Sequence, residues 1–464
     1  MYSRRKSSQV NVGGVPLGGD NPIRVQSMTT TPTMDTDACV GQAVRIIEAG
    51  GEYVRMTTQG TREAENMRNI RAALHARGYD TPLVADVHFN PAVADVAARY
   101  VQKVRINPGN YVDPARTFRH LEYTDSEYAA ELRKIRDRFI PFLDICRSHG
   151  TAIRIGVNHG SLSDRIMSRY GNTPAGMVES SMEFLRICAE QSFGDVVISI
   201  KASNTVVMVQ TVRLLVSRMD SEGMSFPIHL GVTEAGEGED GRIKSAVGIG
   251  ALLAEGIGDT VRVSLSEAPE KEIPVARKLV AYAPESNLRR AAAKAAVTDD
   301  TITLKYNESS LEDFQLKAAM DAGALLIDGF ARELRLISLN PAVTQAQADD
   351  TAEAILQAAR VKFTRTEYIS CPGCGRTLYD LESTIARIKA ATTHLKGLKI
   401  AIMGCIVNGP GEMADADYGY VGAGRGRISL YRGKECIEKN IPEADAVDRL
   451  LALIESDSVS GQPR

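Results

Sequence analysis

The sequence predicts an α/β protein made of a (β/α)8 TIM barrel, a short α/β connecting segment and a C-terminal α/β domain. Three observations predict this architecture. Short apolar runs alternate with amphipathic stretches up to about residue 285, an Ala-rich segment follows, and a compact region with clustered Cys and Gly closes the chain. A chain of 464 residues is long enough for two or three domains. The predicted domains are residues 1–285, 286–360 and 361–464.

The first region contains eight apolar runs with the length of β-strands. They are IRVQSM (23–28), YVRMTT (53–58), LVADVH (83–88), KVRINP (103–108), IRIGVN (153–158), VVISIKAS (196–203), IHLGVTEA (228–235) and VRVSLS (261–266). Eight strand–helix repeats over roughly 265 residues match the size of a (β/α)8 barrel. An open doubly wound sheet is the alternative, but no GxGxxG motif follows the first strand, which disfavours it.

Helices are predicted between these strands and in the two later regions. Ala38–Glu48 and Glu63–Ala76 place apolar residues at helical spacing, and Pro91–Tyr100 opens with a proline, which is favoured in the first turn of a helix. The connecting segment is predicted as a strand (301–306), an amphipathic helix (Ser310–Ala322), a second strand (324–330) and a helix (344–363). The C-terminal domain is predicted as a strand entering a tight turn (366–376), a helix (Asp380–Lys389), a buried strand (398–405), a Gly-rich loop (407–424), a strand (427–433) and a helix (Glu443–Glu455).

The bulk composition disfavours several classes of protein. The net charge is −3 and the isoelectric point about 6.2, which argues against a nucleic-acid or anionic-membrane partner. No apolar run has the length of a membrane span, and no apolar stretch follows the basic start, so we expect no secretory signal. Seven cysteines in such a chain do not form a secreted disulfide framework. We expect a cytoplasmic protein in which clustered cysteines bind metal.

Polar side chains gather at or just after the C-terminal ends of the predicted strands. Five of them are cations, namely Arg55, Arg105, Arg154, Lys201 and Arg262, and the others include Asp86, His88, Asn107, Asn158, Glu234 and Ser264. In a barrel these ends form one mouth. A single Arg at a strand end is more often a surface ion-pair partner, but five cations at one mouth repel one another unless an anion lies among them. Arg forks match phosphate oxygens, so the pattern favours a diphosphate-sized anion.

The C-terminal region contains a candidate metal site with the pattern Cys371-x2-Cys374-x30-Cys405-x6-Glu412. Thiolates are soft ligands that select zinc or iron–sulfur clusters. Glycines after Cys405 would let the backbone approach a bulky inorganic group. With three thiolates and one carboxylate, the hard oxygen would be the weakest ligand, and the iron that it holds would be the most readily exposed.

Other interpretations of the cysteines remain open. The CxxC pair alone could be a thioredoxin-like redox site, and three cysteines with another group could hold a structural zinc ion. Cys436 could replace Glu412 as the fourth ligand, although we expect it to be a buried structural thiol. Three further cysteines lie in apolar helical patterns and are predicted to be core residues: Cys39, Cys146 and Cys188.

Four segments together resemble the 4-hydroxy-3-methylbut-2-enyl diphosphate synthases. They are VQSMTTTPTMDT (25–36), LVADVHFNP (83–91), YISCPGCGRTL (368–378) and GCIVNGPGEMADADYG (404–419). The resemblance covers roughly residues 9–285 and 360–455. It implies an oxidoreductase of isoprenoid biosynthesis by the methylerythritol phosphate pathway. Such enzymes convert 2-C-methyl-D-erythritol 2,4-cyclodiphosphate to 4-hydroxy-3-methylbut-2-enyl diphosphate by reductive ring opening and loss of water, using a [4Fe–4S] cluster and single electrons from ferredoxin or flavodoxin.

The resemblance also implies roles for individual residues. The implied cluster ligands are Cys371, Cys374, Cys405 and Glu412, so the C-terminal α/β domain would be the [4Fe–4S] cluster domain. The implied substrate-binding residues are Arg55, His88, Arg105, Asn107, Arg154, Asn158, Lys201, Arg262 and Ser264. Glu234 would be the barrel acid, as proton donor or hydrogen-bond partner of the substrate, and the two catalytic residues would be Glu234 and Glu412.

Two departures from the family pattern matter. Gly373 stands where members often have Ser, which suits a tight turn. The connecting segment is intermediate between two-domain members, which have almost nothing there, and three-domain members, which have a large insert. We expect a homodimer with each site assembled in trans between two subunits. Two competing functions also remain: a pterin-binding type of synthase with a zinc module, and an iron–sulfur sensor.

Overall fold

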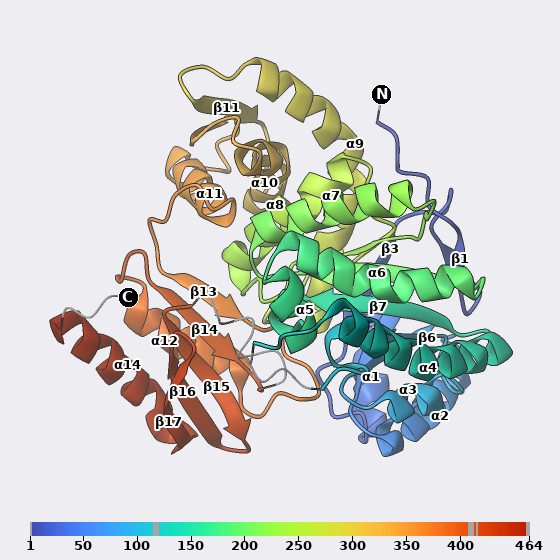
Figure 1. The fold of residues 1–464 in the computed structure, drawn as a ribbon. Coiled ribbons are helices and arrows are strands. Elements are labelled where there is room, and N and C mark those ends of the chain that lie inside the picture. Colours follow the sequence, from blue (N-terminus) through green and yellow to red (C-terminus); the bar gives the residue numbers. More distant parts are fainter. Residues whose placement is uncertain (1, 115–119, 407–412, 414–415, 461–464) are drawn as a thin grey trace.

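The computed structural model describes residues 2–114, 120–406, 413 and 416–460. The three regions of the chain form three neighbouring parts of the molecule (Figure 1). The barrel occupies the blue to yellow part of the ribbon, the connecting segment lies against its helices α8 and α9, and the C-terminal sheet stands beside the barrel. Among the described residues, no helix is both long and apolar enough to cross a membrane.

The barrel is an eight-stranded parallel sheet in the order β8-β7-β6-β5-β4-β3-β10-β9. Its strands are β3 (Arg24–Met28), β4 (Tyr53–Thr58), β5 (Leu83–Val87), β6 (Lys103–Ile106), β7 (Ala152–Asn158), β8 (Val196–Lys201), β9 (His229–Leu230) and β10 (Thr260–Val261). A further parallel bridge joins Ile198 to Ile228, just before β9, so the sheet closes on itself. The predicted barrel and its eight strands are therefore confirmed.

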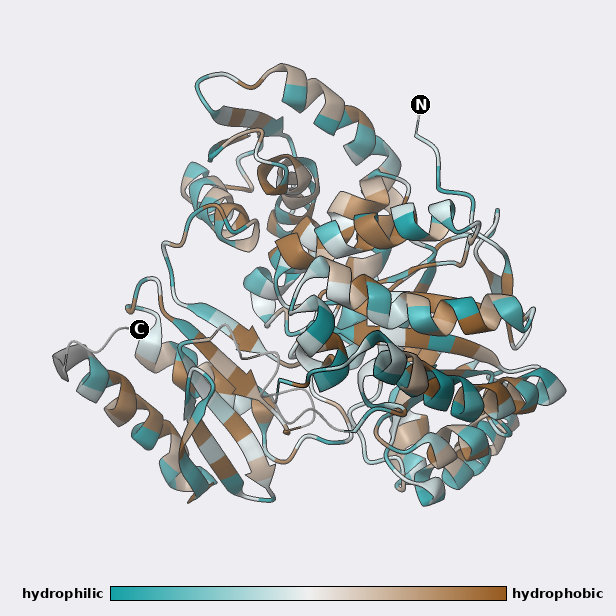
Figure 2. Cartoon of the chain, in the orientation of Figure 1, coloured by the Kyte–Doolittle hydropathy of each residue, from teal (hydrophilic) through white to brown (hydrophobic). Residues whose placement is uncertain are grey.

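Helices surround the barrel, as predicted. They are α1 (Thr36–Glu48), α2 (Thr61–Ala76), α3 (Pro91–Ala97), α4 (Asp125–His149), α5 (Asp164–Tyr170), α6 (Pro174–Glu190), α7 (Thr205–Ser221), α8 (Gly238–Ala254) and α9 (Glu272–Ala295), with short 3₁₀ turns η1 (Pro108–Asn110), η2 (His159–Ser161) and η3 (Pro269–Lys271). The side chain of Asn90 caps α3, and Pro91 occupies its first turn, as the sequence indicates. The helices show alternating hydrophobic and hydrophilic stretches, as expected for elements with one buried face (Figure 2).

The barrel strands separate apolar and polar side chains onto opposite faces. On β7, Ile153, Ile155 and Val157 belong to the apolar core. Arg154 and Asn158 line the internal pocket instead. Because successive strand residues point to opposite faces, one strand supplies both the core and the site.

A hairpin closes the other end of the barrel. Its strands are β1 (Val10–Val12) and β2 (Val15–Leu17), which pair antiparallel. Val10, Val12 and Leu17 form one apolar cluster with Tyr53 and other residues from the N-terminal ends of the barrel strands. The barrel is therefore closed at the end opposite its mouth.

The connecting segment packs tightly onto the barrel. It contains β11 (Thr301–Tyr306), α10 (Leu311–Ile327), β12 (Glu333–Ser338) and α11 (Gln345–Ala358). Its apolar residues belong to the same core cluster as the barrel helices. Gly323 of α10 lies so close to α8 that a Cβ there would be 3.0 Å from Cα of Val247. Helix α9 runs without a break through residue 285, the predicted end of the barrel domain.

The predicted strand over residues 324–330 is wrong. Residues 324–327 complete α10, and the partner of β11 is β12, which pairs with it in parallel. Helix α10 is buried on nearly all sides, so its apolar residues lack the one-sided helical pattern. A short apolar run of this kind cannot be assigned to helix or strand by periodicity alone.

The C-terminal domain is a five-stranded sheet with helices against it. The strands are β13 (Glu367–Ser370), β14 (Lys399–Met403), β15 (Tyr418–Gly424), β16 (Arg427–Arg432) and β17 (Glu435–Pro442), and the helices are α12 (Leu381–Thr392) and α14 (Glu443–Ser460). The first three strands are parallel and the last three antiparallel.

Two expectations for this domain are wrong in part. The Gly-rich loop was predicted over 407–424, but Tyr418–Gly424 forms β15, and β17 was not predicted. Gly422 is required in β15 because a Cβ there would be 2.5 Å from the carbonyl oxygen of Gly404. Glycines selected for close packing thus conceal a strand from propensity-based prediction.

Candidate active site

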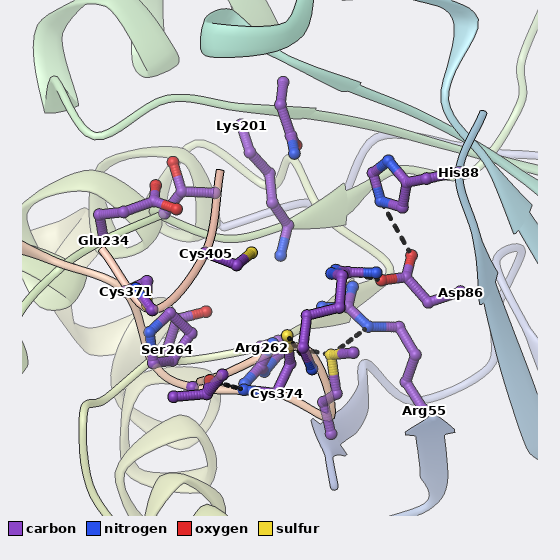
Figure 3. A pocket seen from close by; sticks show the side chains of 18 of the residues that line it. Arg55, Asp86, His88, Lys201, Glu234, Arg262, Ser264, Cys371, Cys374 and Cys405 are labelled. Carbon is purple, nitrogen blue, oxygen red and sulfur yellow. Dashed lines mark hydrogen bonds and ion pairs between the residues drawn. The ribbon is translucent and has the colours of Figure 1, made fainter. Parts of the chain in front are cut away.

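A pocket lies where the mouth of the barrel meets the C-terminal domain (Figure 3). Its barrel side contains the five cations Arg55, Arg105, Arg154, Lys201 and Arg262, here called the mouth cations, together with His88, Asn158, Glu234 and Ser264. Its other side is residues 371–376, here called the cysteine turn, with Cys405. The structure therefore brings together nearly all of the predicted site residues that it describes.

The mouth cations are buried and repel one another. Each has at most 8% of its surface exposed. Burial lowers the pKa of Arg55 to about 9, with Arg262 and Arg105 acting in the same direction and Asp86 opposing them. Burial and then Arg55 and Arg105 lower the pKa of Arg154 well below its ordinary value. A bound anion would relieve this repulsion.

Two of the five mouth cations, Arg105 and Arg262, hydrogen-bond to carboxylates, whereas Arg154 has unpaired donors within the described part of the chain. Arg262 donates to both oxygens of Glu272 at 3.0 and 2.9 Å. Arg105 donates to Asp86 at 2.8 Å and to the carbonyl oxygen of Gly156 at 2.9 Å. Nε and Nη1 of Arg154, by contrast, have no hydrogen-bond partner among the described residues. Buried guanidinium groups are rarely left unpaired, so Arg154 is available for an anion.

His88 is held neutral beside these cations. Burial and then Arg105 lower its pKa well below the ordinary value. Arg105 donates to Nε2 of His88, and Nδ1 of the ring lies 3.3 Å from Nδ2 of Asn110. The imidazole can therefore serve as a neutral hydrogen-bonding group at the mouth.

Glu234 is a buried acid in a constrained backbone conformation. Its φ is +49°, in the left-handed region that is uncommon for residues other than glycine. Burial raises its pKa, while Thr233 and Lys201 oppose that shift. Glu234 lines the pocket (Figure 3), and its Oε2 has no hydrogen-bond partner among the described residues. A protonated carboxyl group here could donate to a ligand.

Asn107 is placed differently from the other predicted residues. Its Oδ1 accepts from the backbone N–H of Gly109, and its Nδ2 donates to Oγ of Ser161 at 2.8 Å. Both ends of the amide are thus used to hold η1 against η2. Its role as a substrate ligand stays a prediction.

The cysteine turn presents thiols and backbone donors to the pocket. Cys371, Cys374 and Cys405 all line it. The N–H of Gly404 donates to Sγ of Cys371 at 3.2 Å, and the N–H of Arg376 donates to Sγ of Cys374 at 3.4 Å. Burial raises the pKa of Cys371 to about 12. Bound cationic metal would favour the thiolate form.

The chemistry of this donor set is compatible with an iron–sulfur cluster. Among the described residues, no three His, Cys, Asp or Glu side chains converge closely enough to hold one metal ion. A cluster separates its protein ligands, because each binds a different iron, and N–H donors to sulfur are typical of its surroundings. Glu412, the predicted fourth ligand, lies outside the described residues.

The remaining cysteines lie away from this pocket. Cys39, Cys146 and Cys188 are fully buried in the apolar core, which confirms their predicted placement. Cys436 lies on β17, where its thiol donates to the carbonyl oxygen of Glu438 at 3.7 Å. It is half-buried, so the expectation of a buried thiol is wrong.

The C-terminal domain is attached directly to the mouth of the same chain's barrel. Ser370 forms a parallel bridge with Ala235, next to Glu234. The hydroxyl of Ser266 lies 3.0 Å from that of Ser370 and donates to the carbonyl oxygen of Cys371 at 2.8 Å. The expectation of a site made in trans is thus contradicted, because one chain supplies both sides of the pocket.

Sequence reasoning assigned no site role to several residues of this pocket, among them Asp86, Arg376 and Met28. Asp86 lies at the end of a predicted strand, but the sequence pattern predicts no binding or catalytic role for it. Arg376 follows the cysteines directly and reaches Asp86, with 3.5 Å between Nη2 and Oδ2. Met28 accepts from Nε of Arg55 at 3.0 Å. The position of Arg376 within the cysteine motif was a signal for it, whereas nothing in the sequence indicated Met28.

The fold and the pocket define a TIM-barrel protein whose mouth is covered by a thiol-bearing α/β domain of the same chain. Residues 7–277 match the GcpE TIM-barrel domain, and residues 367–456 match the GcpE protein C-terminal domain. The chain belongs to the GcpE family.

Curated relatives are similar over nearly their whole length. The chain is 55% identical to the 4-hydroxy-3-methylbut-2-en-1-yl diphosphate synthase (flavodoxin) of Phocaeicola vulgatus, with 98% of each chain covered. It is 53% identical to the protein of the same name from Bacteroides fragilis, with 98% of this chain and 96% of that protein covered. Among solved structures, an N-acetylneuraminic acid synthetase from Leptospira borgpetersenii has 11% identity and a TM-score of 0.38, with 61% of this chain and 90% of that chain covered.

The relatives are longer than this chain. The first alignment spans 604 positions, whereas this chain has 464 residues, so at least 140 positions have no counterpart here. Neither GcpE domain covers the stretch between residues 277 and 367. The difference in length supports the prediction that the connecting segment is shortened, which stays a prediction.

Proposed function

We propose that this protein catalyses the reductive dehydration and ring opening of 2-C-methyl-D-erythritol 2,4-cyclodiphosphate to 4-hydroxy-3-methylbut-2-enyl diphosphate in isoprenoid biosynthesis. Two electrons and two protons enter and one water leaves. The observation that supports this best is that three thiols and five cations line one pocket. The names of the relatives support the same reaction and support flavodoxin as electron donor, and ferredoxin is the alternative donor.

The mouth cations would bind the cyclic diphosphate. Arg154 has unpaired donors, and Lys201 and Arg262 face the same space. Charge-assisted hydrogen bonds to phosphate oxygens would replace the repulsion among the cations. Asn158, Ser264 and neutral His88 would orient the uncharged part of the substrate.

Glu234 would deliver a proton. Burial raises its pKa, which favours the protonated form of the carboxyl group. The strained backbone and the bridge between Ala235 and Ser370 fix its position at the junction of the two domains. A held acid of this kind is suited to protonate the oxygen that leaves as water.

Cys371, Cys374 and Cys405 would hold a [4Fe–4S] cluster, with Glu412 as the fourth ligand. The cluster would supply electrons singly and act as a Lewis acid toward a substrate oxygen. The N–H groups of Gly404 and Arg376 would stabilise the thiolates. Met403 and Gly404 line the same side of the pocket.

Anaerobic reconstitution followed by an assay tests the proposal. We expect brown protein with about four irons per chain, and turnover of the cyclic diphosphate with reduced flavodoxin or a strong chemical reductant. A cluster without turnover would indicate an iron–sulfur sensor. Zinc without sulfide would indicate the pterin-type synthase instead.

A further inference from the structure

Arg376 extends from the cysteine turn into the barrel mouth. Its side chain is 10% exposed and lines the same pocket as the mouth cations. The turn itself is tightly seated, since a Cβ on Gly375 would lie 2.8 Å from the carbonyl oxygen of Thr31. The backbone from which the Arg376 side chain extends is therefore held in place. It lies next to Cys374, on the side of the pocket that faces the barrel strands.

Charges of both signs surround Arg376. Burial lowers its pKa, but Cys374 and Asp86 outweigh this effect and hold the pKa above the ordinary value. Arg55 and Arg105 both experience its charge, which lowers the pKa of each after the larger effect of burial. Bringing a further guanidinium to five buried cations is unfavourable unless negative charge is present. Asp86 supplies part of that negative charge, and an anion in the pocket would supply more.

Asp86 is the barrel carboxylate that Arg376 contacts. The distance of 3.5 Å between Nη2 and Oδ2 is long for a charge-assisted hydrogen bond, which normally measures about 2.7–2.9 Å. The other oxygen, Oδ1, is already occupied by Arg105 at 2.8 Å. Nε of Arg376 is buried and has no hydrogen-bond partner among the described residues. The fork of Arg376 is thus incompletely satisfied and faces the anion pocket.

We propose that Arg376 is a further ligand of the substrate's diphosphate, supplied by the cysteine turn, and that Asp86 holds its guanidinium until phosphate oxygens replace the carboxylate. The inference rests on the proposed function for the identity of the anion. Under it, one side chain links the occupied anion site to the segment that bears Cys371 and Cys374. Substrate binding would then help to set the position of the cysteine turn over the mouth.

The test measures binding of inorganic pyrophosphate to the cluster-loaded protein by calorimetry, and KM and kcat with the cyclic diphosphate. We expect Arg376→Gln to weaken pyrophosphate binding and to raise KM by about tenfold or more, the size of a lost charged hydrogen bond. Iron content and the spectrum of the resting cluster should stay unchanged. Asp86→Asn should tighten pyrophosphate binding more in the wild-type background than in the Arg376→Gln background, where only the pairing of Asp86 with Arg105 is lost.

Lys389→Gln is the matched control. Lys389 is also a cation of the C-terminal domain that contacts barrel carboxylates, at 3.4 Å from Glu237 and 3.8 Å from Asp240, but it lies outside the mouth. Its loss should leave pyrophosphate affinity unchanged. If Arg376→Gln loses its cluster, Arg376→Lys keeps the charge without the fork, and we expect affinity between the other two.

Unchanged pyrophosphate affinity in both Arg376 variants would overturn the inference, and would assign Arg376 to packing of the turn. The affinity for pyrophosphate can be measured whether or not the protein catalyses the proposed reaction. Wild-type protein that binds pyrophosphate through Arg376 but does not convert the cyclic diphosphate would refute the proposed function and leave this inference standing.

Discussion

At the scale of single residues, the strand-end rule located most of the site. Parallel strands bring their C-terminal ends to one mouth, so Arg55, Arg154 and Lys201 could be grouped from the sequence. The rule does not distinguish polar residues that line the pocket from those that hydrogen-bond within a loop. Asn107 is an example, because both ends of its amide bond to the turns beside it. Nor could the rule reveal the pairing of Asp86 with Arg376, which arises only when two domains meet.

Glu234 carries the first prediction. Glu234→Gln should lower kcat by about 10²–10⁴ and change KM little, because a proton donor acts on the chemical step. The raised pKa means that wild-type kcat should fall as the pH rises through it, and the variant should lose this alkaline decline. Steady-state kinetics against pH, with exposed Glu239→Gln as control, checks this. An identical pH profile in Glu234→Gln would rule out the role.

At the scale of elements, residues chosen for packing limited what could be predicted. The end of α10 is apolar on nearly all sides, so its sequence also fits the predicted buried strand. The glycines of β15 are typical of a loop, although these residues form a strand. Helix starts were more predictable, because caps such as Asn90 with Pro91 act locally. The barrel strands were predictable because their short apolar runs repeat between amphipathic helices.

Strand β7 supports the second prediction. A Cβ on Gly156 would lie 2.5 Å from Nε of Arg105, so Gly156 leaves room for that side chain. Gly156→Ala should displace Arg105 and raise KM by about tenfold, as for a lost charged hydrogen bond, with little change in melting temperature. Gly194→Ala is the control, since nothing lies within 4 Å of its Cβ position. An unchanged KM would show that Arg105 is not needed in its present position.

At the scale of the whole molecule, one buried carboxylate joins the three regions. Glu367 of β13 pairs with Lys244 of α8 at 3.3 Å and with Arg360, which follows α11. Periodicity does not reveal this cluster, because Lys244 and Glu367 are 123 positions apart and come together only when the C-terminal domain packs on the barrel. The connecting segment therefore does more than link two domains, since its Arg360 pairs with the same carboxylate that binds Lys244 of the barrel.

This cluster gives the third prediction. Glu367→Gln leaves two buried cations without their carboxylate and should reduce the free energy of unfolding by about 3–5 kcal/mol. Burial alone would raise the pKa of Glu367, but Lys244 and Arg360 hold it below the ordinary value. The stabilisation is therefore present above the unfolded-state pKa and is lost as the pH falls through the folded-state pKa.

Denaturant unfolding at several pH values measures this effect. The difference between wild type and Glu367→Gln should shrink in acid. Glu308→Gln, which removes a partly exposed pair with Lys317, should cost at most about 1 kcal/mol. Equal effects of the two substitutions at neutral pH would refute the special role of Glu367.

The central claim is that one chain supplies both the cationic mouth and the thiols of its own site. Mixing two inactive variants, Arg154→Gln and Cys374→Ala, after joint unfolding and cluster reconstitution tests it most directly, with wild-type protein treated in parallel. The account predicts that the mixture has only the summed residual activity of its parents. Recovery to about a quarter of wild-type activity, the level expected for sites made between two subunits of randomly paired dimers, would contradict it.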